Sequence, residues 1–156
     1  MTAKRYILWD HDGVLVDTEH WYYSATRKAL AELGVVLESD LYMQCMVRGE
    51  SSWELALAEG IAEDLVVAKR HDRDRYYQQY LYEQDIEITG VSDVLKTLSA
   101  RFGMAIVTTS RRADFELIHR ERDIVGHMDF VLVREDYHSS KPDPEPYLLA
   151  MHRFEA

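Results

Sequence analysis

The chain has few of the features that stabilise a secreted protein or hold a protein in a membrane. Its single cysteine, Cys45, cannot form an internal disulfide, and no group of cysteines and histidines has the spacing of a zinc site. Charged residues interrupt every apolar run within a few positions, whereas a membrane-spanning helix needs about 20 apolar residues. The apolar run Tyr6–Trp9 is also far too short for the core of a signal peptide. We therefore expect a cytoplasmic protein without zinc, in which Cys45 is a small buried residue.

Positive charge is scarce as well. The chain has 18 Lys and Arg residues against 28 Asp and Glu residues, which gives a net charge of -10 at pH 7. The resulting field repels nucleic acids and anionic membrane surfaces. With 47% hydrophobic and 29% charged residues, the composition is that of an ordinary globular protein. A chain of 156 residues has room for one core and a modest inserted module. We expect a folded protein that binds neither nucleic acid nor a membrane.

The pattern of apolar residues predicts an α/β fold. Short apolar runs that end in small or acidic residues indicate strands at 5–9, 104–107 and 130–133. Helical spacing predicts helices at 91–99 and 113–122, and a last helix that begins in the proline-rich segment 142–146. Because strands alternate with helices in this part of the chain, we expect a parallel sheet.

A second region contains only helical patterns. They lie at 18–33, from Ser51 onward and at 63–82. We therefore expect a parallel-sheet core formed by 1–17 and 89–156, interrupted by an all-helical insertion at 18–88. Within the insertion, charges of both signs alternate over 69–75, which indicates a solvated helix face rather than a basic patch.

The strongest chemical signal follows the first strand, in the sequence Asp10-His11-Asp12-Gly13-Val14. Side chains two positions apart on an extended chain point to the same face, so both carboxylates can reach one ligand. Such a pair suits magnesium and phosphoryl chemistry, because one carboxylate can attack phosphorus while the other handles the proton of the leaving group. An acidic turn that merely closes a strand is the alternative interpretation.

Three motifs, taken together, resemble those of the haloacid dehalogenase-like hydrolases, and in particular their phosphatase and phosphomutase branch. The segment Asp10–Glu19 resembles the first motif of that family over its whole length, Thr108-Thr109-Ser110 the second, and Ser140-Lys141-Pro142 the third. Taken singly, the second motif could be a capped helix start and the third a surface lysine before a turn. The resemblance implies a Rossmann-like α/β core, and it implies that 18–88 is a small helical cap.

The resemblance also assigns roles to residues. It implies that Asp10 is the nucleophile and forms an aspartyl-phosphate, and that Asp12 is the general acid and base. Thr108, Thr109 and Lys141 would bind the phosphate, and Asp10 and Asp12 would hold Mg²⁺. These residues follow strands of the same parallel sheet, and ligands of open α/β sheets bind at the carboxyl ends of such strands. In the cap, Arg48 is the candidate for contact with a second anionic or hydroxylated part of the substrate; an ordinary solvated arginine is the alternative.

The chain departs from the family pattern after Lys141-Pro142, where it has no further strand with an acidic motif to complete the metal site. We therefore expect either a fragment of a longer protein or a chain whose missing strands come from another chain. We also expect an exposed sheet edge that can self-associate, and little or no activity from the 156 residues alone.

Several functions remain open at this point. The leading hypothesis is a magnesium-dependent phosphatase of a small phosphorylated metabolite. The alternatives are a sugar-phosphate mutase of the same fold and a catalytically silent fragment or binding module. A 2-haloacid dehalogenase is disfavoured because a halide leaves without a proton, which gives Asp12 no task. Phosphonate hydrolysis would need a lysine in the cap for a Schiff base, and neither Lys28 nor Lys69 has an apolar setting.

Overall fold

The computed structural model describes residues 4–155. Its sheet has three parallel strands, β1 (Tyr6–Trp9), β2 (Gly103–Val107) and β3 (Phe130–Leu132), in the order β1-β2-β3. In the register of the sheet, Ala105 lies opposite Leu8 on one side and opposite Phe130 on the other. Since the strands are parallel, their carboxyl ends share one edge of the sheet. The expected parallel sheet is confirmed, and β1 and β3 are its edge strands within the described part of the chain.

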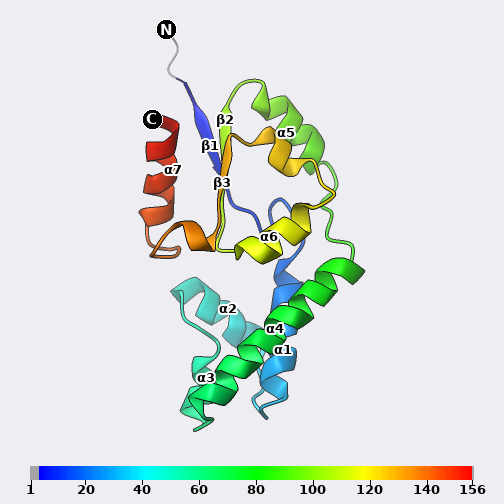
Figure 1. The fold of residues 1–156 in the computed structure, drawn as a ribbon, viewed down its shortest axis with the longest axis vertical. Coiled ribbons are helices and arrows are strands. Elements are labelled where there is room, and N and C mark those ends of the chain that lie inside the picture. The colour runs from blue at the N-terminus through cyan, green and yellow to red at the C-terminus, as the bar shows by residue number, and fades with distance from the viewer. Residues whose placement is uncertain (1–3, 156) are drawn as a thin grey trace. The chain divides into compact units, whose positions relative to one another are not determined.

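Helices connect the strands and cover both faces of the sheet (Figure 1). They are α5 (Val91–Ser99), α6 (Arg112–His119), the 3-10 turns η1 (Ile124–His127) and η2 (Arg134–Asp136), and α7 (Glu145–Glu155). In Figure 1, α7 lies on one side of the sheet, whereas α5 and α6 lie on the other. Ala150 of α7 packs against Val107 and Leu132. All residues of β2 are buried. This arrangement is the expected α/β fold.

The remaining helices are α1 (Glu19–Ala31), α2 (Ser39–Arg48), α3 (Glu54–Ala58) and α4 (Glu63–Glu83). They share an apolar cluster formed by Ala29, Leu30, Val35, Leu37, Tyr42, Trp53, Ala56 and Val66. The chain divides into two compact units, which we call the core unit (up to Asp17 and from Asp85 onward) and the helical unit (Thr18–Gln84). Residues 85–88, expected in the helical insertion, belong to the core unit. The function of the helical unit as a cap stays a prediction.

The core unit brings together the two chain segments that lead into and out of the helical unit. The backbone amide of Asp17 donates to the carbonyl of Ile86 at 2.8 Å, and Val16 forms an antiparallel bridge with Glu87. Val16 and Ile86 are both buried. The two crossing points are therefore fixed side by side within the core unit.

Helix α2 was not predicted as a separate helix, and the sequence explains why. Tyr42 and Cys45 face the interior, but Met43, Met46 and Val47 are exposed, so the apolar residues show no clear helical stripe. The helix ends at Gly49, which adopts a left-handed conformation with φ 68°; glycine adopts this conformation without steric cost. The expectation that Cys45 is buried is confirmed.

The prediction of a solvated helix face over 69–75 is wrong at one position. Arg73 is 7% exposed, and its guanidinium lies 4.7 Å from the ring centre of Tyr22 and 5.7 Å from that of Trp53. By contrast, the ammonium group of Lys69 pairs with Glu32 at the surface. Alternating charge in the sequence cannot show that one member of the series lies against aromatic rings from other segments of the helical unit. No helix within residues 4–155 has the length and apolar character to cross a membrane.

Candidate active site

The loop after β1 places three polar residues at the carboxyl edge of the sheet. Gly13 adopts a positive φ of 76°, and its amide donates to the carbonyl of Val16 at 2.7 Å. The amide of Leu15 donates to the carbonyl of His11 at 2.8 Å. These bonds close a tight turn that a residue with a side chain would strain at position 13. The turn fixes the backbone from which Asp10, His11 and Asp12 project.

Asp10 is the more exposed of the two carboxylates, with 60% of its side chain accessible to solvent. Its Oδ1 atom accepts a hydrogen bond from the backbone amide of His11 at 2.8 Å, and the ammonium group of Lys141 lies 3.1 Å from the same oxygen. Lys141 comes from the segment before α7, so the first and third sequence motifs meet at this atom. Neither contact uses Oδ2, and a nucleophile needs such an oxygen directed toward substrate.

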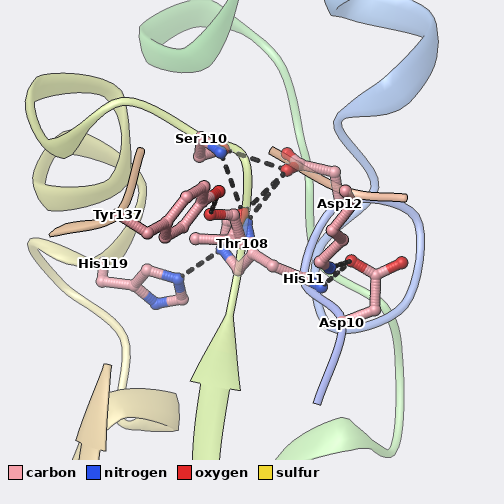
Figure 2. Close-up of polar contacts among 8 residues, drawn as sticks. Asp10, His11, Asp12, Thr108, Ser110, His119 and Tyr137 are labelled. Carbon is pink, nitrogen blue, oxygen red and sulfur yellow. Dashed lines mark hydrogen bonds and ion pairs between the residues drawn. The ribbon is translucent and has the colours of Figure 1, made fainter. Parts of the chain in front are cut away.

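Asp12 is 26% exposed and has a different set of partners (Figure 2). Its Oδ2 atom accepts from the hydroxyl of Ser110 at 2.9 Å and from that of Thr108 at 3.5 Å. The Nδ1 atom of His11 lies 3.2 Å from the same oxygen. Asp12 is thus held by the end of β2, whereas Asp10 is held by the segment before α7. The carboxylates of Asp10 and Asp12 are turned toward separate groups in Figure 2.

Thr108 is a buried anchor at the end of β2, with 1% of its surface exposed. Its hydroxyl accepts a hydrogen bond from the amide of Ser110 at 3.0 Å, and its carbonyl accepts one from the hydroxyl of Tyr137 at 2.6 Å. Burial raises the pKa of Tyr137, which keeps this hydroxyl protonated as a donor. Because the Thr108 side chain is occupied with Asp12 and Ser110, its role as a phosphate ligand stays a prediction. Thr109, the next residue, is exposed.

Two histidines continue the network on the far side of Asp12. His11 is fully buried, and its Nε2 atom lies 2.8 Å from Nε2 of His119, at the end of α6. The rings of His11 and His119 also pack on Phe115, with centroid distances of 4.9 and 4.4 Å. Burial, followed by the neighbouring His11, lowers the pKa of His119 from 6.5 to about 3. His119 is therefore neutral at pH 7.

The structure brings together most of the residues singled out in the sequence. Asp10 contacts Lys141, and Asp12 contacts Thr108. Arg48 is exposed and is the last residue of α2 in the helical unit, and its role stays a prediction.

Sequence reasoning did not assign roles to Ser110, His119 or Tyr137. Ser110 stands inside a recognised motif, so its position was a usable signal. His119 is 108 positions from His11, and Tyr137 is 29 positions from Thr108; no local pattern indicates either contact.

The donor atoms at this site suit magnesium. Mg²⁺ prefers oxygen ligands and is usually held by one or two carboxylates together with water and substrate phosphate. Asp10 would provide a solvent-accessible carboxylate, and the backbone carbonyl of Asp12 would provide a further oxygen. Among residues 4–155, no group of three or more His, Cys, Asp and Glu side chains is arranged to hold a metal ion. The residues present therefore fit Mg²⁺ in kind and supply part of its shell.

Comparison with known proteins gives relatives over almost the whole chain. A phosphorylated carbohydrates phosphatase of Thermotoga maritima is 29% identical over 154 residues, covering 94% of this chain and 69% of the relative. A fructose-1-phosphate phosphatase of Escherichia coli is 27% identical over 150 residues, covering 94% of this chain and 78% of the relative. Among crystal structures, a proposed beta-phosphoglucomutase of Thermotoga maritima superimposes with a TM-score of 0.69 at 26% identity, covering 97% of this chain and 71% of that protein.

A family model agrees with the three motifs and with the fold. The model that describes haloacid dehalogenase-like hydrolases matches residues 7–156, which is nearly the full chain. The matched region contains both units, the carboxylates at the end of β1 and the lysine before α7. The chain thus belongs to the haloacid dehalogenase-like hydrolases, a family of enzymes with a Rossmann-like α/β fold.

Proposed function

We propose that this protein hydrolyses the phosphate monoester of a small sugar or related metabolite through an aspartyl-phosphate on Asp10. The observation that carries the proposal is the contact between Asp10 and Lys141, which places a solvent-accessible carboxylate beside a fixed positive charge. A carboxylate attacks phosphorus readily once the charge on the phosphoryl oxygens is neutralised. The similarity to two phosphatases of phosphorylated sugars supports the substrate class.

In the first step, an Asp10 oxygen attacks phosphorus, and the bond between phosphorus and the sugar oxygen breaks. Asp12, in its protonated form, gives its proton to the departing sugar oxygen, so that the product leaves as a neutral alcohol. Lys141 balances the charge that spreads over the phosphoryl oxygens. Thr109 is exposed and belongs to the second sequence motif, and its backbone amide is our candidate for a further hydrogen bond to the phosphoryl group.

In the second step, water attacks the phosphorus of the aspartyl-phosphate, and the bond between Asp10 and phosphorus breaks. Asp12 is now a carboxylate and accepts a proton from the attacking water. Inorganic phosphate leaves, Asp10 returns to its carboxylate form, and Asp12 is protonated for the next cycle. The same side chain therefore serves as acid and then as base, which requires that its position stay fixed throughout the cycle.

We assign Asp10, through its carboxylate, and Asp12, through its backbone carbonyl, as the residues that would hold Mg²⁺, which leaves the Asp12 carboxyl group for proton transfer. When bound, the ion supplies charge neutralisation for the phosphoryl group and brings it into line with the nucleophile. We also propose that the helical unit is a cap that selects the substrate, with Arg48 as its contact residue. The exposed position of Arg48 at the end of α2 is consistent with contact with a ligand.

A sugar-phosphate mutase is the second candidate, and the similarity to a proposed beta-phosphoglucomutase favours keeping it. A mutase and a phosphatase form the same aspartyl-phosphate and differ only in which molecule receives the phosphoryl group. The relevant comparison is therefore between transfer to water and transfer to a sugar hydroxyl.

The deciding experiment measures both fates of the phosphoryl group with the purified full-length protein, because we expect little or no activity from the 156 residues alone. It would be incubated with magnesium and a panel of hexose, pentose and glycerol phosphates, with assays for inorganic phosphate and for isomerised sugar phosphate. We expect release of inorganic phosphate that stops when a chelator removes the metal. Conversion between two sugar phosphates without phosphate release would instead establish the mutase. Failure to modify any ester, with Asp10 never labelled by phosphate, would contradict both functions.

A further inference from the structure

The structure contains a continuous chain of hydrogen-bonding side chains that ends on the Asp12 carboxylate. His119 Nε2 lies 2.8 Å from His11 Nε2, and His11 Nδ1 lies 3.2 Å from Asp12 Oδ2 (Figure 2). His11 is enclosed, with no exposed surface, and so it cannot change partners without disturbing the core. The mechanism above uses neither histidine.

The chemistry of the three groups fixes the direction of these hydrogen bonds. Asp12 Oδ2 accepts from Ser110 and Thr108. It carries no proton when Asp12 is ionised or is protonated on Oδ1, so His11 must carry a proton on Nδ1 to bond to it. A neutral His11 then has an unprotonated Nε2, which can only accept. His119 must therefore donate its Nε2 proton, and as a neutral ring it has a single proton to give.

The other nitrogen of His119 supports this assignment. Within the described residues, its Nδ1 atom is buried and has no hydrogen-bond partner. A proton placed on Nδ1 would be a buried donor without an acceptor, and Nε2 would have none to give to His11. Placing the proton on Nε2 keeps both hydrogen bonds of the chain. Phe115 holds both imidazole rings in place by packing against them.

We propose that His119 and His11 are positioning residues for Asp12: His119 selects the His11 tautomer with a proton on Nδ1, and His11 in turn fixes the orientation of the Asp12 carboxylate. This inference rests on the proposed function, because it assumes that Asp12 transfers the proton. It goes further in naming two residues outside the phosphate and metal contacts on which that proton transfer depends. The hydrogen-bond partners that orient metal-binding side chains typically contribute about tenfold to a hundredfold to metal affinity or activity, and we expect an effect at the lower end of that range here.

The expected signature is a selective loss that depends on the leaving group. An alkyl ester such as glycerol phosphate needs protonation of its leaving oxygen, whereas p-nitrophenyl phosphate needs little. His119→Phe keeps the ring that packs on Phe115 but removes the donor. We expect it to lower kcat on glycerol phosphate by about tenfold while kcat on p-nitrophenyl phosphate and KM for both esters change little. His119→Gln, whose amide can donate, should restore most of the loss on glycerol phosphate.

A purely structural role would give a different result, because a loosened core would affect both esters equally. His152→Gln, at an exposed position on α7, serves as a matched control for loss of a histidine. If His119→Phe fails to fold, His119→Met can be compared with His119→Gln. The two side chains have similar length, but only glutamine has a hydrogen-bond donor. Equal losses on the two esters, or equal activity of the variants with and without a donor, would overturn the proposal.

Nitrogen-15 NMR of the histidine rings tests the hydrogen-bond chain without turnover. We expect His11 to be protonated on Nδ1 at pH 7 in the unmodified protein and in His119→Gln, and to lose this preference in His119→Phe. A wild-type His11 without a proton on Nδ1 would overturn the inference whatever the activity. The wild-type protein could instead show the expected His11 tautomer but hydrolyse no phosphate ester. That result would reject the proposed function, and with it the positioning role in that reaction.

Discussion

The helical unit and the core unit hold charged side chains in different ways, because the helical unit encloses Arg73 whereas the core unit leaves Asp10 exposed. In the helical unit, Arg73 donates to Thr26 at 3.3 Å and to Asp74 at 2.8 Å and lies against the rings of Tyr22 and Trp53. The positive charge of Arg73 is therefore stabilised by partners within the helical unit. In the core unit, Asp10 keeps 60% of its side chain in solvent while Lys141 holds one of its oxygens. Burial of charge alone therefore does not mark a reactive site.

The useful distinction is whether a polar group has an atom left for a ligand. Arg73 uses its guanidinium for contacts within its own unit, which stabilise packing between α1 and α4. Asp10 has one oxygen held and the other outside those contacts, which is the arrangement that a nucleophile requires. The following variants test this distinction, because none of them should change both chemistry and stability.

The largest effect should come from Asp10→Asn. An amide oxygen is a poor nucleophile and adds no charge to a metal site, so we expect a loss of activity of about ten-thousandfold or more. The melting temperature should change little, because the side chain is mostly exposed. Phosphate release from p-nitrophenyl phosphate and thermal unfolding would be measured on the same preparation. Substantial activity in this variant would remove Asp10 from the nucleophile position.

Asp12→Asn should reduce turnover of a sugar phosphate by about a thousandfold, because the leaving oxygen loses its proton donor. The loss on p-nitrophenyl phosphate should be smaller in the first step, so aspartyl-phosphate should accumulate. Mass spectrometry of a rapidly quenched reaction would locate the phosphoryl group. Its appearance on residue 12 of the wild-type protein rather than on Asp10 would reverse the two assignments.

Arg73→Ala should act on stability instead of chemistry. Removing the guanidinium leaves a gap beside Tyr22 and Trp53 and disrupts a buried polar network, which should cost about 3 kcal/mol of unfolding free energy. Urea unfolding would measure the change, and Arg73→Met would separate the loss of packing from the loss of charge. If the folded Arg73→Ala protein hydrolysed p-nitrophenyl phosphate at a much reduced kcat, the helical unit would have a chemical role that its contacts do not show.

Arg48→Ala should have a moderate effect that depends on the substrate. A contact with a remote part of the substrate contributes binding energy only for substrates that reach it. We expect KM to rise about fivefold for the natural sugar phosphate, equivalent to roughly 1 kcal/mol, and to remain the same for p-nitrophenyl phosphate. Steady-state kinetics on both esters would decide, and equal changes would exclude Arg48 from substrate selection.

The smallest effect should come from Lys69→Gln. Lys69 pairs with Glu32 at the surface, and the same contact raises the pKa of Lys69 and lowers that of Glu32. Solvent screens such exposed pairs, so the melting temperature should barely move. The contrast with Arg73→Ala, four positions along the same helix, is a direct test of burial as the deciding factor. A large loss of stability in Lys69→Gln would break the comparison.

Much of the core unit could be predicted from sequence because its signals are local. The strand before Asp10 ends in an acidic turn with Gly13, and the proline cluster at 142–146 spans the start of α7, which begins at Glu145. The order of three motifs also indicated which residues meet at the sheet edge. The positions of Asp10 and Lys141 illustrate this, since parallel strands bring their following segments to one side.

The rest depends on contacts between distant residues. The pairing of His11 with His119 and the enclosure of Arg73 have no local signature, because neither apolar period nor charge pattern records which side chain lies opposite. Helix α2 was missed because Met43 and Met46 are exposed and blur its apolar stripe. Ser110 is one of the residues that hold the Asp12 carboxylate, and its hydroxyl could equally have capped a helix.

The paired crossing points at Val16–Asp17 and Ile86–Glu87 have a consequence for how the fold tolerates change. The helical unit enters and leaves the core unit at neighbouring positions. For the core unit, the inserted segment therefore acts as a loop whose two ends must be brought together. The entropy of loop closure grows with the logarithm of length, and each doubling costs only about 0.6 kcal/mol. Insertions of very different size can therefore be exchanged at this junction for nearly the same entropic cost. The residues around Asp10 and Asp12 can remain unchanged while a new insertion supplies different surface groups.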